Sequence, residues 1–290
     1  MRKYSRLLVI ITLVVVIGTF VFMSVYNEPI NYTGDNQIIS IELSVTNIFL
    51  IPVNDKYVLI DTGYEKDWLL FQKGLSDNNI SLNQISHIIL THHHDDHAGL
   101  LNNIISENNE IIIIMSELAP ELLSVGMNDV TRGGGLLNRR VNFLIRNFKT
   151  FYISVILGEK LDKNDAFKFP PYYVRDNDII IKEETDLRYI GIDLDGKIIC
   201  TPGHTIDSIS IILGEDIIFV GDAAANMLRI AGTKYCVIFI TDLNEYYRSW
   251  EKIISENVKY IFPAHGKPFR VEKLIRNIWK NKEKNMIPFP

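Results

Sequence analysis

The stretch HHHDDHA at residues 92–98 carries more chemical information than any other part of this 290-residue chain. Only one register fits a His-x-His-x-Asp-His spacing, and it selects four candidate metal ligands: His92, His94, Asp96 and His97. Imidazole nitrogens and a carboxylate, with no thiolate, suit zinc or another divalent first-row metal in a hydrolytic site. Because four ligands within six positions exceed the needs of one open site, the spacing indicates two ions held side by side.

The cluster is predicted to lie in a loop between a strand and a helix. Residues 86–91 are apolar and β-branched, which predicts a buried strand, and residues 98–101 are predicted to begin a helix. Loops of this kind present catalytic groups on rigid elements. A solvated histidine tract that binds metal adventitiously is the alternative interpretation of the stretch.

Three later segments argue against an isolated histidine tract. His204 follows the apolar residues 197–199 and a Pro-Gly turn, Asp222 follows the apolar residues 217–220, and His265 follows residues 260–263. Each acid or imidazole therefore stands where an apolar strand is predicted to end.

Together with Asp61 in the sequence Leu59-Ile60-Asp61-Thr62-Gly63, these motifs resemble the metallo-β-lactamase superfamily, particularly its glyoxalase II-like and lactonase-like members. The five motifs follow the family's order across residues 37–270. The resemblance implies that a first zinc is held by His92, His94 and His204, a second by Asp96, His97 and His265, and that both are bridged by Asp222.

The same resemblance implies that Asp61 orients a ligand histidine from outside the coordination sphere and fixes its tautomer. An ordinary Asp-Thr-Gly turn after a buried strand is the alternative for Asp61. Two of the seven histidines, His87 and His93, are not among the implied ligands. His87 is expected to be packed or solvent-facing, and His93 to point away from the metals or to line the rim.

The implied ion pair indicates hydrolytic chemistry. A metal lowers the pKa of bound water from 15.7 toward about 7, and two ions about 3.5 to 4 Å apart hold a hydroxide between them. Asp96 is the candidate for proton transfer, and Mn²⁺ or Fe²⁺ is an alternative to zinc. The chain contains no Gly-x-Ser-x-Gly motif that would supply a serine nucleophile.

The identity of Asp222 narrows the expected substrates. The resemblance implies that a bridging aspartate is typical of thioesterases, lactonases, phosphodiesterases and nucleases, whereas true β-lactamases generally lack it. His94 also stands where the flavo-diiron oxidoreductases of the family carry glutamate. Hydrolysis of an ester, thioester, lactone or phosphodiester is therefore expected. A non-catalytic, metal-stabilised ligand-binding protein and a β-lactamase remain as alternatives.

The expected architecture is an α/β domain over residues 31–290, arranged as a four-layer αββα sandwich. Strands are predicted at 38–43, 47–53, 57–60 and 111–115, and a helix at 65–75. A helical insertion at about residues 116–170 is expected to form a lid. Weaker candidates for substrate contacts are Tyr172, Tyr173, Arg139 and Arg140, which are more simply packed tyrosines and a solvated arginine pair.

Residues 1–30 are predicted to form a membrane anchor. Arg2, Lys3 and Arg6 precede a largely apolar run at 7–26, close to the roughly 20 residues that span a bilayer. A secretory signal has a shorter apolar core and an Ala-x-Ala-like cleavage site. An uncleaved anchor with an extracytoplasmic catalytic domain is favoured. A secreted, cleaved protein is the alternative.

Charge and cysteine content add limits on partners. The net charge of −5 and the isoelectric point of 5.8 disfavour nucleic acid, which requires a basic footprint, so a small-molecule substrate is expected. Residues 267–290 predict a basic amphipathic helix packed on its own domain. The two cysteines permit at most one disulfide, and the sequence does not predict an oligomeric state.

Overall fold

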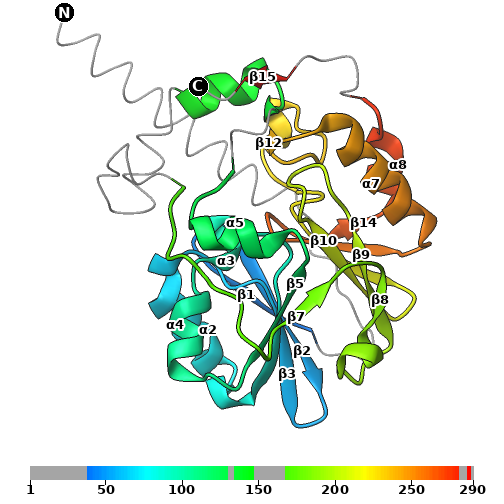
Figure 1. Ribbon diagram of the computed structural model, residues 1–290. Helices are drawn as coiled ribbons and strands as arrows, with labels where there is room; N and C mark the ends of the chain where they lie inside the picture. Colours follow the sequence, from blue (N-terminus) through cyan, green and yellow to red (C-terminus); the bar gives the residue numbers. More distant parts are fainter. Residues whose placement is uncertain (1–37, 130–133, 147–166, 281–285, 289–290) are drawn as a thin grey trace, which may run out of the picture. The chain divides into compact units, whose positions relative to one another are not determined.

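The computed structural model describes residues 38–129, 134–146, 167–280 and 286–288. Within them the chain forms a mixed α/β sandwich of two six-stranded sheets and a smaller three-stranded sheet (Figure 1). The predicted anchor at residues 7–26 lies outside the described residues. Among the described ones, the structure contains no helix long and apolar enough to cross a membrane.

The first sheet has the order β1-β2-β3-β4-β5-β7. Its first three strands are antiparallel, and β3, β4, β5 and β7 run parallel. The strands are β1 Ile39–Glu42, β2 Asn47–Val53, β3 Lys56–Ile60, β4 Ile85–Ile89, β5 Ile112–Ser116 and β7 Ile179–Ile181. The strands predicted from the sequence in this region are therefore confirmed.

The second sheet has the order β14-β13-β11-β10-β9-β8, with a parallel pair at β11 and β13 and antiparallel pairs elsewhere. Its strands are β8 Thr185–Asp186, β9 Gly196–Cys200, β10 Ile209–Leu213, β11 Ile217–Gly221, β13 Tyr260–Pro263 and β14 Phe269–Arg270. Every residue of β10 and β11 is buried. Continuous burial of this kind is expected of strands that are covered on both faces.

Helices lie along the outer faces of both sheets (Figure 1). Beside the first sheet are η1 Glu65–Asp67, α2 Trp68–Asp77, η2 Leu82–Gln84, α3 Asp95–Ala98, α4 Leu101–Glu107 and α5 Ala119–Val125. Beside the second are η3 Leu187–Ile190, α7 Leu243–Ser255 and α8 Glu272–Asn277. The short turn η4 Arg229–Ala231 instead packs through Ala231 against Leu136 and Val141. The predicted helix at 65–75 therefore begins as a 3₁₀ turn and continues as α2.

An aromatic cluster joins the two sheets. The ring of Phe49 in β2 lies 5.0 Å from that of Phe219 in β11 and 5.8 Å from that of Phe262 in β13. Aromatic pairs at such distances add to the stabilisation that comes from burial alone. The sandwich is thus closed by packing directly between its two sheets.

The third sheet consists of β12 Phe239–Ile240, β6 Gly135–Leu136 and β15 Ile287–Pro288. Strand β6 lies within the predicted insertion at 116–170, as do α5 and a helical stretch at 139–146. Two hydrogen bonds join the chain on either side of residues 130–166 of the insertion. Asn128 N donates to Phe167 O, and Phe169 N donates to Gly126 O. Residues 130–133 and 147–166, including Arg132, Gly133 and part of the predicted lid, lie outside the described residues.

The predicted C-terminal helix is shorter than expected. Helix α8 covers only Glu272–Asn277, and the chain leaves the helix at Ile278, whose ψ is 138°. Leu274 is nevertheless fully buried, and the Trp279 ring packs 5.0 Å from that of Tyr247 in α7. Leu274 and Trp279 therefore pack on the domain as expected, whereas Ile275 is 50% exposed and the helix ends at Asn277.

Candidate metal centre

The candidate ligands stand at the carboxyl ends of strands from both sheets. The 92–97 cluster follows β4, and its last residues begin α3. His204, Asp222 and His265 follow β9, β11 and β13 in the second sheet. Gly221 permits the close approach of the two sheets here, because its φ of +49° favours glycine and a Cβ would lie 2.5 Å from Thr91 Oγ1.

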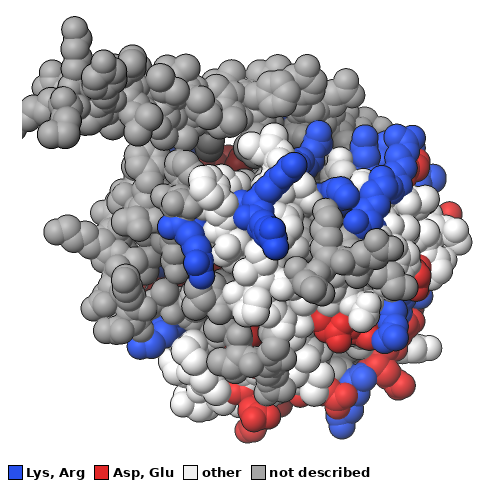
Figure 2. All heavy atoms as spheres, turned by 90° about the horizontal axis from the view of Figure 1, so that it is seen from above, with Lys and Arg blue, Asp and Glu red and all other residues white. Residues whose placement is uncertain are grey.

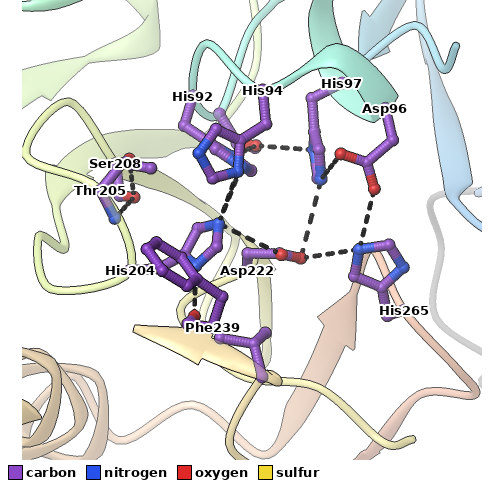
Figure 3. A network of polar contacts seen from close by, with 12 residues as sticks. His92, His94, Asp96, His97, His204, Thr205, Ser208, Asp222, Phe239 and His265 are labelled. Atoms are coloured by element: carbon purple, nitrogen blue, oxygen red, sulfur yellow. Dashed lines mark hydrogen bonds and ion pairs between the residues drawn. The ribbon is translucent and has the colours of Figure 1, made fainter. Parts of the chain in front are cut away.

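Three imidazoles converge as one group of ligand atoms. His204 Nε2 lies 3.2 Å from His92 Nε2 and 3.0 Å from His94 Nδ1 (Figure 3). Burial, followed by the neighbouring imidazoles, lowers the pKa of both His92 and His94 well below the ordinary value. These rings are therefore neutral at neutral pH, the state in which histidine binds a metal.

A second group combines a carboxylate with two imidazoles. His265 Nε2 lies 3.2 Å from Asp96 Oδ2, and His97 Nε2 lies 3.7 Å from Asp96 Oδ1. Burial alone would lower the pKa of both histidines, but the carboxylates outweigh it. They raise the pKa of His97 to about 9 and that of His265 well above its ordinary value.

Asp222 lies between the two groups. Its Oδ2 is 3.4 Å from His204 Nε2, and its Oδ1 is 3.3 Å from His265 Nε2 and 3.7 Å from His97 Nε2 (Figure 3). One carboxylate oxygen thus faces each group. This is the arrangement in which a single side chain can contact two cations.

The donor set fits a pair of divalent cations. All seven side chains belong to residues that are at most 9% exposed: His92, His94, Asp96, His97, His204, Asp222 and His265. Among the described residues, His97 Nε2 and Asp222 Oδ1 are buried without a hydrogen-bond partner. Buried polar atoms of native proteins normally have partners. A cation between these two atoms would satisfy both.

Acceptors behind the imidazoles fix their tautomers. His204 Nδ1 lies 2.9 Å from Phe239 O, and His265 Nδ1 lies 2.9 Å from Val45 O. Because a carbonyl oxygen only accepts, each Nδ1 carries the proton and donates it. When the rings are neutral, as they must be to bind a metal, the Nε2 lone pair of each is therefore directed into the centre.

Asp61 supports His97 in the same way. The buried Asp61 carboxylate accepts from Thr91 N at 2.8 Å and from Thr91 Oγ1, and its Oδ2 lies 2.9 Å from His97 Nδ1. The residue has a φ of +59°, within the left-handed region. The structure thus places Asp61 behind a candidate ligand, outside the two groups.

Of the two positions predicted for His93, the one on the rim of the site is wrong. His93 is 1% exposed, and its Nδ1 lies 2.9 Å from Asp207 Oδ1. His87 is half-buried and its Nδ1 lies 2.9 Å from Ser86 Oγ, as expected for a packed residue. Neither histidine belongs to the convergent groups among the described residues.

Other side chains around the centre were not predicted. Asn128 holds Asp95, donating from Nδ2 to Asp95 Oδ1 and accepting from Asp95 N, both at 2.8 Å. Tyr172, a candidate for a substrate contact, is instead buried and donates to Asp178 Oδ2 at 2.6 Å. Asn128 lies 33 positions from Asp95, and no local motif links the two residues. Only a pattern of correlated changes among homologues would have indicated this contact.

The sequence model of the metallo-beta-lactamase superfamily matches residues 41–265. The chain belongs to the metallo-beta-lactamase superfamily. It is also 37% identical over 70 residues to the beta-lactamase-like protein 2 homolog of Drosophila melanogaster. That alignment covers 24% of this chain and 21% of the fly protein, so it spans about a fifth of the relative.

Solved structures of the superfamily share this fold. BJP-1, a subclass B3 metallo-beta-lactamase of Bradyrhizobium japonicum, superposes with a TM-score of 0.55 at 17% identity, covering 79% of this chain and 75% of its own. An archaeal superfamily protein from Sulfolobus tokodaii superposes with a TM-score of 0.54 at 18% identity. The match covers 87% of this chain and 89% of the archaeal one. Likeness at these identities shows the fold alone, and a fold by itself does not determine the substrate.

Metal loading of this superfamily member is expected to release protons at neutral pH. The carboxylates beside His97, whose pKa is about 9, and beside His265 keep both rings protonated at pH 7, and a ligating nitrogen must lose its proton. The apparent affinity for Zn²⁺ should therefore rise between pH 7 and 9, by about tenfold per pH unit for each proton released.

Calorimetric titration of the metal-free protein with Zn²⁺, in buffers of different ionisation enthalpy, measures this proton release. The same titration at pH 9.5 is the control, because release from the imidazoles should be smaller there. An observed heat that does not depend on the buffer at pH 7 would contradict the prediction.

Proposed function

We propose that this protein is a dinuclear metallo-hydrolase that cleaves an ester, thioester, lactone or phosphodiester. The observation that carries the proposal is the position of Asp222, with one oxygen toward each ligand group. Two bound cations, zinc or alternatively Mn²⁺ or Fe²⁺, would lower the pKa of a water held between them and polarise the substrate's oxygen.

In this proposal the seven side chains divide into two sets. One ion is held by His92, His94 and His204, the other by Asp96, His97 and His265, and Asp222 contacts both. The outer acceptors keep each imidazole lone pair aimed inward, so the site needs little reorganisation when a substrate binds.

Asp96 is the candidate to accept the proton that the attacking water gives up. Burial raises the pKa of its carboxyl, but the adjacent imidazoles, His97 foremost, outweigh burial and hold that pKa well below its usual range. The group is therefore ionised at neutral pH, as a proton acceptor must be, although its lowered pKa makes it a weak base. Thr46 Oγ1 donates to Asp96 Oδ2 at 3.3 Å and holds the carboxylate in place.

The surroundings of the centre belong to the same proposal. We propose a four-layer αββα order, supported by the helices on the outer faces of both sheets, and an insertion at about 116–170 that borders the substrate site. Its stem contacts the metal loop through Asn128 and Asp95. A small-molecule substrate fits the net negative charge of the chain better than nucleic acid does.

Replacing Asp96 or Asp222 by alanine should lower the bound metal and reduce turnover by more than the 10- to 100-fold typical of outer-sphere changes, roughly abolishing it. The reason is that each change removes a proposed ligand and one of the buried carboxylates that face the imidazoles. Metal content and hydrolysis of chromogenic ester, thioester, lactone and phosphodiester substrates are measured.

The matched control is Asp195→Ala, since the side chain of Asp195 is 76% exposed. Full activity in either ligand variant would refute the assignment. A zinc-loaded wild-type protein that hydrolyses none of these substrates would favour the alternative of a non-catalytic, metal-stabilised binding protein.

A second candidate function, β-lactam hydrolysis, is suggested by the fold shared with BJP-1. We expect little or no hydrolysis of a chromogenic cephalosporin, because Asp222 occupies the position at which true β-lactamases generally lack a bridging aspartate. The zinc-loaded protein is assayed by the colour change on ring opening. Fast turnover would instead establish the lactamase function.

We also propose that residues 7–26 anchor the protein in a membrane with the catalytic domain outside the cytoplasm. The support is their apolar character after Arg2, Lys3 and Arg6. The full chain should stay in the membrane pellet after a carbonate wash, and protease added to intact spheroplasts should digest its catalytic domain. A shortened chain in the medium would favour the secreted alternative. If protease digested the catalytic domain only after the spheroplasts were lysed, both the anchored and the secreted placements would be contradicted.

A further inference from the structure

The two candidate ion sites differ in what holds them. His92 and His94 flank His93, whose side chain is not among the candidate ligands. His93 Nδ1 lies 2.9 Å from Asp207 Oδ1, and His93 N donates to Asp207 Oδ2 at 2.9 Å. The side chains of the pair are 1% and 0% exposed.

The hydrogen bonds fix the direction of this contact. Asp129 N donates to His93 Nε2 at 3.3 Å, so Nε2 supplies a lone pair. Nδ1 therefore carries the proton and donates it to Asp207. Both oxygens of the Asp207 carboxylate are used on His93, one by the ring and one by the backbone.

The pair joins the two loops that supply the first ligand group. Asp207 lies three positions after His204, whereas His93 lies between His92 and His94. These loops extend from different sheets. A neighbouring backbone hydrogen bond, Ile209 N to Thr91 O at 2.9 Å, runs in the same place. The His93–Asp207 contact thus spans the gap across which His204 must meet His92 and His94.

The second ligand group has a different support, the turn between β1 and β2. Thr46 is fully buried, and its Oγ1 donates to Asp96 Oδ2 at 3.3 Å. Val45 O accepts from His265 Nδ1 at 2.9 Å. Asn47 holds both sides of His265, because its N donates to Ala264 O at 2.7 Å and its Nδ2 to Gly266 O at 2.8 Å.

We propose that each ion site has its own positioning element: the buried His93–Asp207 pair for the site formed by His92, His94 and His204, and the turn at residues 45–47, acting through Thr46, for the site formed by Asp96, His97 and His265. This inference rests on the proposed two-ion centre and assigns functions to residues outside it. His93, Asp207 and Thr46 act through the ligands and do not touch the ions.

The expected effects follow from burial. Removing one partner leaves a buried donor or acceptor unsatisfied and frees the ligand beside it. Loss of an outer-sphere partner typically weakens metal binding by about 10- to 100-fold. Because the two supports act on different ligands, the loss of either support should weaken metal binding at one site only.

The test is ¹¹³Cd²⁺ binding to the full chain, since ¹¹³Cd NMR gives one resonance for each occupied site. The His265→Ala variant, which leaves only the first ligand set complete, identifies the first-site resonance. Occupancy of each site is then measured against a competing chelator. Thermal unfolding of each metal-free variant shows that it is folded.

In His93→Leu, which lacks both ring nitrogens, the first site should bind Cd²⁺ about 10- to 100-fold more weakly while the second site is unchanged. The conservative variant His93→Asn retains an amide donor toward Asp207. Its first site should therefore keep most of the wild-type affinity for Cd²⁺. If His93→Leu does not fold, Asp207→Asn replaces it, because that variant keeps the shape but offers one acceptor oxygen in place of two.

The matched variant is Thr46→Val, which is nearly isosteric and removes only the hydroxyl. It should weaken the second site and leave the first unchanged. Equal weakening of both sites by each variant, or no weakening by either, would overturn the inference while leaving the two-ion centre intact. A wild-type chain that shows fewer than two resonances would overturn the two-ion centre, and this inference with it.

Discussion

The structure depends on one electrostatic constraint: acids and imidazoles are buried together at the junction of two sheets. Each of the seven candidate ligand residues is at most 9% exposed. Buried ionisable groups are costly unless they are paired or bind a metal. The centre meets this requirement by alternating carboxylates and imidazoles, so that Asp96 and Asp222 each face histidines from more than one loop. Two cations would complete the same balance.

The surrounding scaffold positions these buried groups. The ligands follow strands, and the two sheets are held at a fixed separation by the rings of Phe49, Phe219 and Phe262. Figure 2 shows several Lys and Arg side chains on the face seen from above. Charge at the surface is solvated and tolerant of change, whereas the buried centre requires defined partners.

The support of the centre extends beyond the two large sheets. The donor set follows their strands, but the acceptor behind His204 is Phe239 O, in β12 of the third sheet. The insertion contacts this centre at its stem, through Asn128 and the backbone of Asp129. The fold that carries this centre is shared with solved structures at identities below 20%.

The sequence by itself determined the family, the core strands and the identity of the residues that converge. It did so because four candidate ligands lie within one six-residue spacing and the remaining ones follow apolar strands, patterns that depend only on local order. The tertiary structure decided what supports them. His93 meets Asp207 across 114 positions, and Thr46 meets Asp96 across 50. Such contacts depend on the registers of two sheets and on how closely those sheets pack, and the sequence carries no short-range pattern for either.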